Sequence, residues 1–430
     1  MKRLQPAKNG LHGILIVPGD KSISHRAIML GAISHGDTTI HHFLDGEDCR
    51  STMQAFRDLG IKIEQAGTDV LVHGQGFEGL KQSVNPLDMG NSGTTTRLMM
   101  GILAGTDFTT TLTGDSSLQK RPMKRVSQPL SVFGGEVELT QNGTLPAKVI
   151  GHPLHHAEYQ MTVASAQVKS ALIFAALQAD GVSTIIEKLP TRNHTEIMLQ
   201  QFGAEIMTRD NRIISVVPHP HLTGQVVEVP GDISSAAFFL VAGTIVPNSE
   251  ITLQRVNLNP TRTGIIRVLL KMGADLSIEE LPTKGEPLGN ITVKTSKLRP
   301  IDIGAEMIPS LIDELPLVAL LAACANGRSV ITGAEELRVK ETDRIKTVVE
   351  ELRKLGVHVE ELPDGMIIDG QPAWQIRNPQ LTSHGDHRIG MMDAIAVLKA
   401  SDELTMTNEE AINISYPDFF TDLGTLTGRN

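Results

Sequence analysis

The sequence has 430 residues, of which 40% are hydrophobic and 20% are charged. This composition is typical of globular proteins, and the length is enough for two or three domains. A net charge of -10 and an aromatic content of 3% disfavour a general nucleic-acid surface and a base-stacking platform. With two cysteines, no signal peptide and no membrane-spanning run, we expect a protein of the reducing cytoplasm.

Taken in chain order, the predicted elements repeat a unit of about 70 residues six times, which indicates small α/β subdomains rather than a short-repeat solenoid. Each copy opens on a small polar cluster, continues as an apolar helix and passes through a glycine into a strand. The opening clusters lie at 19–22, 90–93, 164–167, 231–234, 312–315 and 385–388. Helix N-termini of this kind bind phosphates and carboxylates, so the pattern predicts an enzyme for anionic substrates.

The first helix of a copy is apolar on most faces, which suits a helix enclosed by sheets. Such helices, each with its following strand, are predicted at 25–34 with 36–40, at 170–179 with 181–186, and at 316–325 with 327–331. An amphipathic second helix is predicted at 52–61, 196–204, 265–274 and 345–357. These helices should end in left-handed glycines, namely Gly60, Gly203, Gly273 and Gly356.

The sixth copy is truncated after Gly424, and we expect the segment 13–17 to supply its missing strand. The six copies then predict two lobes. Copies one to three would form one lobe over residues 20–230, and the rest would form the other over residues 1–19 and 231–430. The chain would cross between the lobes at two Pro-Gly turn signals, Pro18-Gly19 and Pro230-Gly231. Two short crossovers are typical of a hinge, so closure over a ligand is expected.

Candidate anion-binding side chains gather at the starts of the copies. The first cluster surrounds one helix start with the Lys21 ammonium, the Ser22 hydroxyl and the Arg26 guanidinium. It is not a Walker loop, because Asp20 and Leu15 stand where that motif needs glycines. From these residues alone, a phosphate site and a merely capped helix with exposed cations are evenly matched.

The second cluster, residues 91–97, favours binding more clearly. Gly93 has no Cβ to keep its backbone N–H from an anion. We expect Arg97 in the first helical turn, where a cation is unfavourable to the helix dipole unless it has a function. Residues 120–125 hold four cations, a run that is usually solvated, but the expected helix start there raises the prospect of a functional Arg121.

Acid–base groups are predicted in the fifth copy. Asp313 heads an otherwise apolar helix and is a candidate general base, because burial raises the pKa of a carboxyl group. Lys340 and Arg344 lie four residues apart with Glu341 between them, and would share a face if this stretch is helical. Taken alone, the stretch 338–344 is better interpreted as a surface salt-bridge network.

Other polar residues are predicted to be structural. His387 next to Arg388 is more typical of a structural hydrogen bond than of a catalyst. Three histidines lack metal-ligand partners at useful spacing and are expected in loops, namely His152, His155 and His156. Cys324 is expected to pack in the core. No metal site is predicted.

Together these segments resemble the EPSP synthases (5-enolpyruvylshikimate-3-phosphate synthases) through nearly the whole chain. The shared motifs lie in order at 18–26, 91–97, 121–123, 165–167, 338–344 and 386–388. The resemblance implies a two-lobed inside-out α/β barrel, in which each lobe has three βαβαββ units with buried helices. It also implies transfer of the enolpyruvyl group of phosphoenolpyruvate to the 5-hydroxyl of shikimate 3-phosphate, with release of phosphate. A monomer without a cofactor is expected, working through a tetrahedral intermediate.

The resemblance also implies site residues, carried over motif by motif. Shikimate 3-phosphate would be held by Lys21, Ser22, Arg26, Ser165, Gln167, Arg192, Asp313 and Lys340. Phosphoenolpyruvate would be held by Lys21, Gly93, Arg121, Gln167, Arg344 and Arg388. Asp313 would take the proton of the attacking hydroxyl, and Glu341, with Lys21, would transfer a proton at the enolpyruvyl methylene.

The sequence departs from the common bacterial and plant form at several positions. The form Asn-Ala-Gly-Thr-Ala-x-Arg-Pro is replaced at 91–98, where Ser92 and Thr95 stand in place of alanines and Leu98 in place of proline. Ala166 stands where serine is frequent, and a late lysine is missing before Tyr416. These features resemble the second class of the family.

Two rival functions differ in what they require. A UDP-N-acetylglucosamine enolpyruvyl transferase shares the expected architecture but carries a catalytic cysteine in a mobile Gly-rich loop, a position that neither Cys49 nor Cys324 fits. A non-catalytic clamp built from repeats would spread its cations over one extended face and would not need Asp313 or Glu341. The clustering of cations at helix starts disfavours the clamp.

Overall fold

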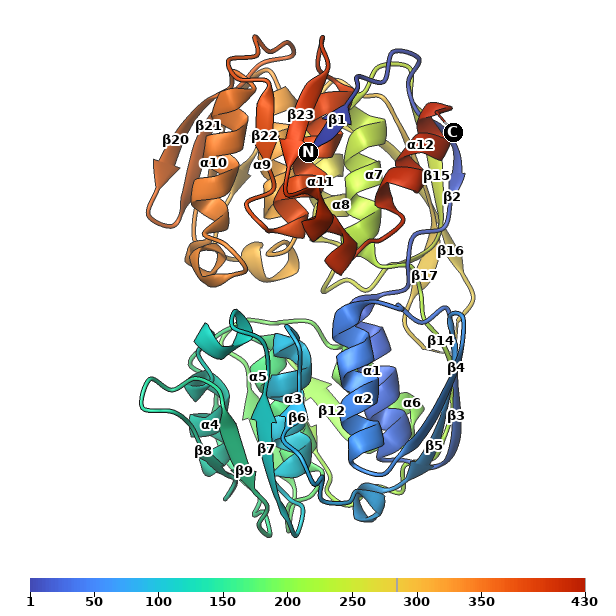
Figure 1. The fold of residues 1–430 in the computed structure, drawn as a ribbon, viewed down its shortest axis with the longest axis vertical. Coiled ribbons are helices and arrows are strands. Elements are labelled where there is room, and N and C mark those ends of the chain that lie inside the picture. Colours follow the sequence, from blue (N-terminus) through green and yellow to red (C-terminus); the bar gives the residue numbers. More distant parts are fainter. Residues whose placement is uncertain (284, 430) are drawn as a thin grey trace. The chain divides into compact units, whose positions relative to one another are not determined.

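The protein is represented by a computed structural model that describes residues 1–283 and 285–429 (Figure 1). The chain divides into two compact units. The middle unit is Gly19–Pro230, joined by Gly285 and Glu286. The terminal unit holds Met1–Pro18, Gly231–Thr283 and the described residues from Pro287 onward. No helix in the described part of the chain has the length and hydropathy needed to cross a bilayer.

The middle unit contains three copies of one α/β pattern. Copy one has α1 (Lys21–Ala32), β3 (His35–His41), α2 (Glu47–Asp58), β4 (Lys62–Ala66) and β5 (Asp69–Gln75), with a short 3-10 helix at Phe77–Gly79. Copy two has β6 (Leu87–Asp88), α3 (Gly93–Leu103), β7 (Thr109–Thr113), a 3-10 helix (Leu118–Lys120), α4 (Lys124–Ser131), β8 (Glu136–Glu138) and β9 (Ala147–Ile150). Copy three has β10 (Glu158–Gln160), α5 (Ala166–Ala176), β11 (Ser183–Ile186), α6 (His194–Gln201), β12 (Ile206–Arg209) and β13 (Ile213–Val216), and β14 (Val226–Glu228) follows it.

The terminal unit repeats the pattern around both chain ends. It begins with β1 (Lys2–Leu4) and β2 (His12–Leu15). Copy four has α7 (Ile233–Ile245), β15 (Glu250–Asn257), α8 (Gly264–Met272), β16 (Asp275–Leu281) and β17 (Leu288–Lys294). Copy five has β18 (Asp302–Ile303), a 3-10 helix (Ile308–Ser310), α9 (Leu315–Cys324), β19 (Gly327–Ile331), a 3-10 helix (Glu335–Val339), α10 (Arg344–Lys354), β20 (His358–Leu362) and β21 (Gly365–Gly370). Copy six has β22 (Gln380–Thr382), α11 (His387–Leu398), β23 (Leu404–Thr407), a 3-10 helix (Glu409–Ile414) and α12 (Phe419–Thr427).

Every copy forms one small sheet in which a first strand lies parallel to the strand that follows the first helix. In copies two, three, five and six this first strand directly precedes the first helix in the chain, as in the pairing of β6 with β7. Copies one and four take it from elsewhere in the chain. Copy one uses β14, where Val226 lies opposite Thr39, and copy four uses β2, where Ile14 lies opposite Thr252.

The prediction that residues 13–17 complete copy six is wrong. The strand β2 instead pairs in parallel with β15 in the sheet of copy four. The sheet of copy six is completed by β1, which runs antiparallel to β23 with Lys2 opposite Met406. The physical reason lies in the pairing: β2 takes the place that a first strand has in the other copies, whereas the short, basic β1 carries no strand signal in its sequence.

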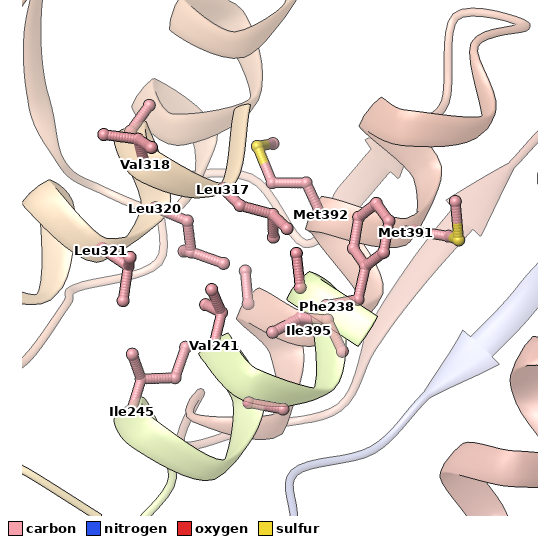
Figure 2. Packing of buried hydrophobic residues seen from close by; sticks show 14 of the residues in the cluster. Phe238, Val241, Ile245, Leu317, Val318, Leu320, Leu321, Met391, Met392 and Ile395 are labelled. Atoms are coloured by element: carbon pink, nitrogen blue, oxygen red, sulfur yellow. The ribbon is translucent and has the colours of Figure 1, made fainter. Parts of the chain in front are cut away.

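The first helices are buried on all sides, as their composition indicated. Every residue of α7 and of α9 is buried. Figure 2 shows how α7, α9 and α11 pack, with Phe238 and Val241 of α7 close to Leu317 and Leu320 of α9 and to Ile395 of α11. The core of the terminal unit therefore lies between helices, with sheets on the outside (Figure 1).

Helix boundaries agree with the predictions at their C-terminal ends better than at their starts. The four predicted terminal glycines all have positive φ, from 90° at Gly60 to 102° at Gly203, and are confirmed. The helices α1 and α5 both begin four residues earlier than predicted. Their first turns are polar and carry little hydrophobic signal, but Asp20 and Ser165 cap them by accepting hydrogen bonds from Ile23 N and Val168 N.

Candidate active site

The start of α1 carries two cations, the partly exposed Lys21 and the buried Arg26. Asp20 caps the helix, and the Nζ atom of Lys21 lies 3.1 Å from Asp48 Oδ2. Ser22, in the same turn, is partly exposed. The cap by Asp20 is common to both interpretations left open for this cluster. The expectation of exposed cations does not hold, because the side chain of Lys21 is 26% accessible and Arg26 is buried.

The guanidinium of Arg26 is held entirely by neutral oxygens. Its Nε donates to Thr195 Oγ1 at 2.7 Å, its Nη2 to Ser170 Oγ at 2.8 Å and its Nη1 to Ser22 O at 2.9 Å. Burial lowers the pKa of Arg26 to about 10, so the group stays charged at neutral pH. Within the described part of the chain Arg26 forms no ion pair, and a buried cation of this kind suits an anionic ligand.

The start of α3 brings two guanidinium groups against one glycine. Gly93 is the first residue of α3, and a Cβ built on it would lie 2.9 Å from Arg97 Nη1 and 3.4 Å from Arg121 Nη1. Arg97 donates to Gln167 Oε1 at 2.5 Å, and Gln167 Nε2 donates to Thr94 Oγ1 at 3.0 Å. The structure therefore brings together three residues predicted for phosphoenolpyruvate, which are Gly93, Arg121 and Gln167.

The expected place of Arg97 needs correction. Arg97 is the fifth residue of α3 and lies in its second turn, where the helix dipole acts more weakly than in the first. Helical side chains point back toward the N-terminus, so its guanidinium still reaches Gly93. Arg97 was not predicted as a binding residue, although its guanidinium, like that of Arg121, lies close to Gly93.

Two further predicted residues lie beside this region. Ser165 is the N-cap of α5, and Gln167 is the second residue of the same helix. Arg192 lies in the loop before α6 and is partly exposed. It is close enough to Arg26 to add to the lowering of that pKa, after the larger effect of burial. Arg192 is thus placed near Arg26, and Ser165 at the start of the helix that carries Gln167.

In the terminal unit, Arg344 is the centre of a buried ionic cluster. Its Nε lies 2.7 Å from Asp386 Oδ2, its Nη2 lies 2.6 Å from Glu341 Oε2 and its Nη1 lies 3.8 Å from Asp313 Oδ1. Arg388 donates from Nη1 to the backbone oxygen of Asp313 at 3.2 Å. Burial lowers the pKa of Arg344, but the carboxylates of Asp386, Glu341 and Asp313 outweigh it and the net pKa is raised. Four predicted residues are joined here, together with Asp386.

The interpretation of residues 338–344 needs two corrections. The stretch is not one helix, because a 3-10 helix ends at Val339 and α10 begins at Arg344, with Asp343 as its cap. Lys340 and Arg344 therefore do not share a helical face. A surface salt-bridge network describes Arg338, which pairs with Asp343 and Glu361, but not Arg344, whose side chain is 1% exposed.

Several residues of these clusters were missed or left aside in the sequence. Asp48, the partner of Lys21, lies in the acidic first turn of α2 and was not predicted as a site residue. Thr195 and Ser170, which bind Arg26, lie in separate helices of copy three and were not predicted either. Asp386 had a signal, since it stands in a Gly-Asp opening cluster. The prediction that Cys324 packs in the core is confirmed: its side chain is buried, and burial raises its pKa to about 12.

The buried imidazole of His25 is expected to make the middle unit sensitive to acid. Burial lowers the pKa of His25 from 6.5 to about 3. Below about pH 6.5 the unfolded chain binds a proton that the folded protein refuses, so the free energy of unfolding should fall by about 1.4 kcal/mol per pH unit down to about pH 3. The variant His25→Gln lacks this contribution.

Urea unfolding between pH 7 and pH 4 measures this effect. The stability gap between the parent protein and His25→Gln should close as the pH falls, whereas His155→Gln, which changes an exposed histidine of the same unit, should follow the parent. A gap that does not change with pH would mean that folded His25 takes up its proton normally.

Comparisons with known proteins agree with one another. A family model described as EPSP synthase (3-phosphoshikimate 1-carboxyvinyltransferase) matches residues 6–423. The chain is 58% identical to a 3-phosphoshikimate 1-carboxyvinyltransferase of Limosilactobacillus fermentum, over 97% of both chains. It is 56% identical to that of Lactiplantibacillus plantarum, over 99% of this chain and 98% of the relative.

The fold agrees with solved structures. An EPSP synthase from Acinetobacter baumannii superimposes with a TM-score of 0.88 at 42% identity, covering 99% of this chain and 97% of that one. The enolpyruvyl transferase NikO from Streptomyces tendae shares the fold at 16% identity, with a TM-score of 0.78 over 99% of this chain and 96% of that one. The predicted two-lobed inside-out α/β fold is confirmed. On its likeness to these proteins over nearly its whole length, the chain belongs to the EPSP synthase family.

Proposed function

We propose how the reaction of this family is divided among the residues of the chain. The protein transfers the enolpyruvyl group of phosphoenolpyruvate to shikimate 3-phosphate. In our proposal the middle unit supplies most of the phosphate and carboxylate binding, and the terminal unit supplies the base and two more guanidinium groups. The protein acts as a monomer in the cytoplasm.

Shikimate 3-phosphate is assigned to the cations and hydroxyls around α1 and α5. Its binding residues are Lys21, Ser22, Arg26, Ser165, Gln167, Arg192, Asp313 and Lys340. The observation that supports this assignment best is the buried Arg26, whose charge is held only by neutral oxygens. A phosphate would give this guanidinium a directly bonded anion, through hydrogen bonds worth about 1.5–3 kcal/mol each.

Phosphoenolpyruvate is assigned to Lys21, Gly93, Arg121, Gln167, Arg344 and Arg388. Two guanidinium groups lie close to the place that a Cβ of Gly93 would take, which supports this part of the proposal. Arg97 joins the assignment as the second of these groups, and it also orients Gln167 through their hydrogen bond. A helix N-terminus beside two cations favours a small doubly charged anion.

The chemistry needs only a base, an acid and fixed cations. Asp313 removes the proton of the 5-hydroxyl, while the oxygen of that hydroxyl forms a bond to C2 of phosphoenolpyruvate. Glu341, with Lys21, delivers a proton to C3, giving the tetrahedral intermediate. The intermediate then loses the proton from C3 and the phosphate from C2, which restores the double bond. Arg344 and Arg388 hold Asp313 in place and stabilise the negative charge of the reacting groups.

Phosphate release with two alternative acceptors tests the proposed function. With phosphoenolpyruvate present, we expect release with shikimate 3-phosphate and none with UDP-N-acetylglucosamine. Release with UDP-N-acetylglucosamine would favour the other enolpyruvyl transferase. Release with neither acceptor, in a folded protein, would favour the non-catalytic clamp.

The variant Gly93→Ala tests the phosphoenolpyruvate assignment. The new Cβ would displace Arg97, whose Nη1 would lie 2.9 Å away, and would press on Arg121. We expect the KM for phosphoenolpyruvate to rise about tenfold or more, which corresponds to about 1.4 kcal/mol of lost binding. The KM for shikimate 3-phosphate, measured in the same assay, serves as the internal control. An unchanged KM for phosphoenolpyruvate would remove Gly93 from that binding site.

A further inference from the structure

A chain of buried hydrogen bonds joins three helices of the middle unit beneath the proposed phosphoenolpyruvate residues. His25 of α1 has its Nδ1 atom 2.6 Å from Thr52 Oγ1 of α2. Thr52 Oγ1 lies 2.7 Å from Thr95 Oγ1 of α3, which lies 2.6 Å from Ser92 Oγ. All four residues are fully buried. The three helices are marked in Figure 1.

The hydrogen bonds of this chain run in one direction. Thr95 donates its hydroxyl proton to Ser92 Oγ, so in its bond with Thr52 it must accept. Thr52 has one hydroxyl proton, which it donates to Thr95 Oγ1 at 2.7 Å rather than to Asp48 O at 3.4 Å. In its bond with His25, Thr52 must therefore accept. This order assigns the proton of the neutral imidazole to Nδ1. The neutral form agrees with the low pKa of this buried histidine.

The two ends of the chain lie beside residues of the proposed site. At one end, Ser92 is the N-cap of α3 and accepts a hydrogen bond from Thr95 N at 3.1 Å, directly before Gly93. At the other end, His25 lies one helical turn after Lys21 in α1, and its partner Thr52 lies one turn after Asp48, which pairs with Lys21. The hydroxyl of Thr95 therefore links the first turn of α3 to α2, the helix whose Asp48 pairs with Lys21.

This link depends on two hydroxyl side chains, those of Ser92 and Thr95. Each of these positions supplies one hydroxyl of the chain. A protein with two alanines has no side chain at these positions that can join α2 to the cap of α3.

We propose that Thr95, acting with Ser92, Thr52 and His25, is a positioning residue that fixes the first turn of α3 for phosphoenolpyruvate binding. The inference rests on the proposed function, which places Gly93 in that binding site. Thr95 does not itself touch the substrate in this scheme. It acts by holding Ser92 and hence the direction of the backbone at Gly93.

Substitutions of Thr95 test the proposal. Thr95→Val keeps the shape but removes the hydroxyl, and we expect the KM for phosphoenolpyruvate to rise about tenfold, as for the loss of about one hydrogen bond. The KM for shikimate 3-phosphate and kcat should stay within about threefold, and Thr95→Ser should restore the KM for phosphoenolpyruvate. Thr96→Val is the matched control, because Thr96 is the neighbouring buried threonine and its hydroxyl donates to Ser92 O, four residues earlier.

A double-mutant cycle shows whether the residues act as one chain. If they do, Thr52→Val should also raise the KM for phosphoenolpyruvate about tenfold, and the double variant should be little worse than either single one. Independent effects that multiply would overturn the proposal. So would equal changes in Thr95→Val and Thr96→Val, which would show a purely structural role.

The Gly93→Ala variant separates this inference from the function on which it rests. If Gly93→Ala raises the KM for phosphoenolpyruvate and Thr95→Val does not, the positioning role is wrong and the binding site stands. If neither variant changes that KM, the assignment of Gly93 fails as well.

Discussion

Replacing Asp313 by asparagine is expected to lower kcat by about a thousandfold, within the range usual for loss of a general base. Asparagine has the same shape but cannot take a proton from the 5-hydroxyl. The backbone oxygen of Asp313, which accepts from Arg388, is unaffected by the change. Shikimate 3-phosphate should therefore still bind, and the loss should fall on turnover.

Phosphate release measures the turnover of Asp313→Asn, and calorimetric titration with shikimate 3-phosphate measures its binding. Asp302→Asn, which changes an exposed aspartate at the start of β18, is the control and should keep full activity. Normal phosphate release by Asp313→Asn would remove this residue from the mechanism. Loss of binding together with turnover would assign it to substrate holding alone.

The substitution Arg344→Met should cause the largest loss of stability. Arg344 is buried, and its most deeply buried partner, Asp386, is 0% exposed. Removing the guanidinium leaves the carboxylate of Asp386 buried without its main cation, which typically costs about 3–5 kcal/mol of the free energy of unfolding. The KM for phosphoenolpyruvate should rise as well, because Arg344 is assigned to that substrate. Urea unfolding and steady-state kinetics measure the two effects separately.

A second substitution separates these two effects. Asparagine at 386 carries no charge and can still accept from Arg388 N, the capping bond of α11 that Asp386 makes at 2.9 Å. The double variant Arg344→Met with Asp386→Asn should therefore regain most of the lost stability. Its KM for phosphoenolpyruvate should stay high. Recovery of both properties would mean that Arg344 only neutralises Asp386, and recovery of neither would mean that the ion pair is not what stabilises this cluster.

Local features of the fold could be predicted from the sequence, whereas pairings between distant segments could not. The terminal glycines, such as Gly60 and Gly356, were found because a helix end needs a left-handed residue whatever its surroundings. The partner of β2 was predicted wrongly, because strand pairing depends on direction and on neighbours far away in the chain. The starts of α1 and α5 were placed too late, because capped polar turns do not show in a hydrophobic pattern.

The candidate site shows the same division. Motifs identified Asp313, Arg344 and Arg388 one by one, and the structure shows that Asp313 contacts both Arg344 of its own copy and Arg388 of copy six. The fixed roles given to them remain proposals. The hydrogen bonds of Thr95 had no sequence signal, because a threonine in a helix has the same pattern whether its hydroxyl is bonded across to another helix or not.

Some sheets take a strand from a distant part of the chain, and this affects the order in which the sheets can form during synthesis. All strands of the copy-one sheet, including β14, lie between Gly19 and Pro230, so every sheet of the middle unit is synthesised before α7. Domains usually fold as units during synthesis. The strands β1 and β2 are made first, but β1 can pair only after β23 has been synthesised, and β2 only after β15. We therefore expect the segment translated first to be among the last to settle into its native sheets.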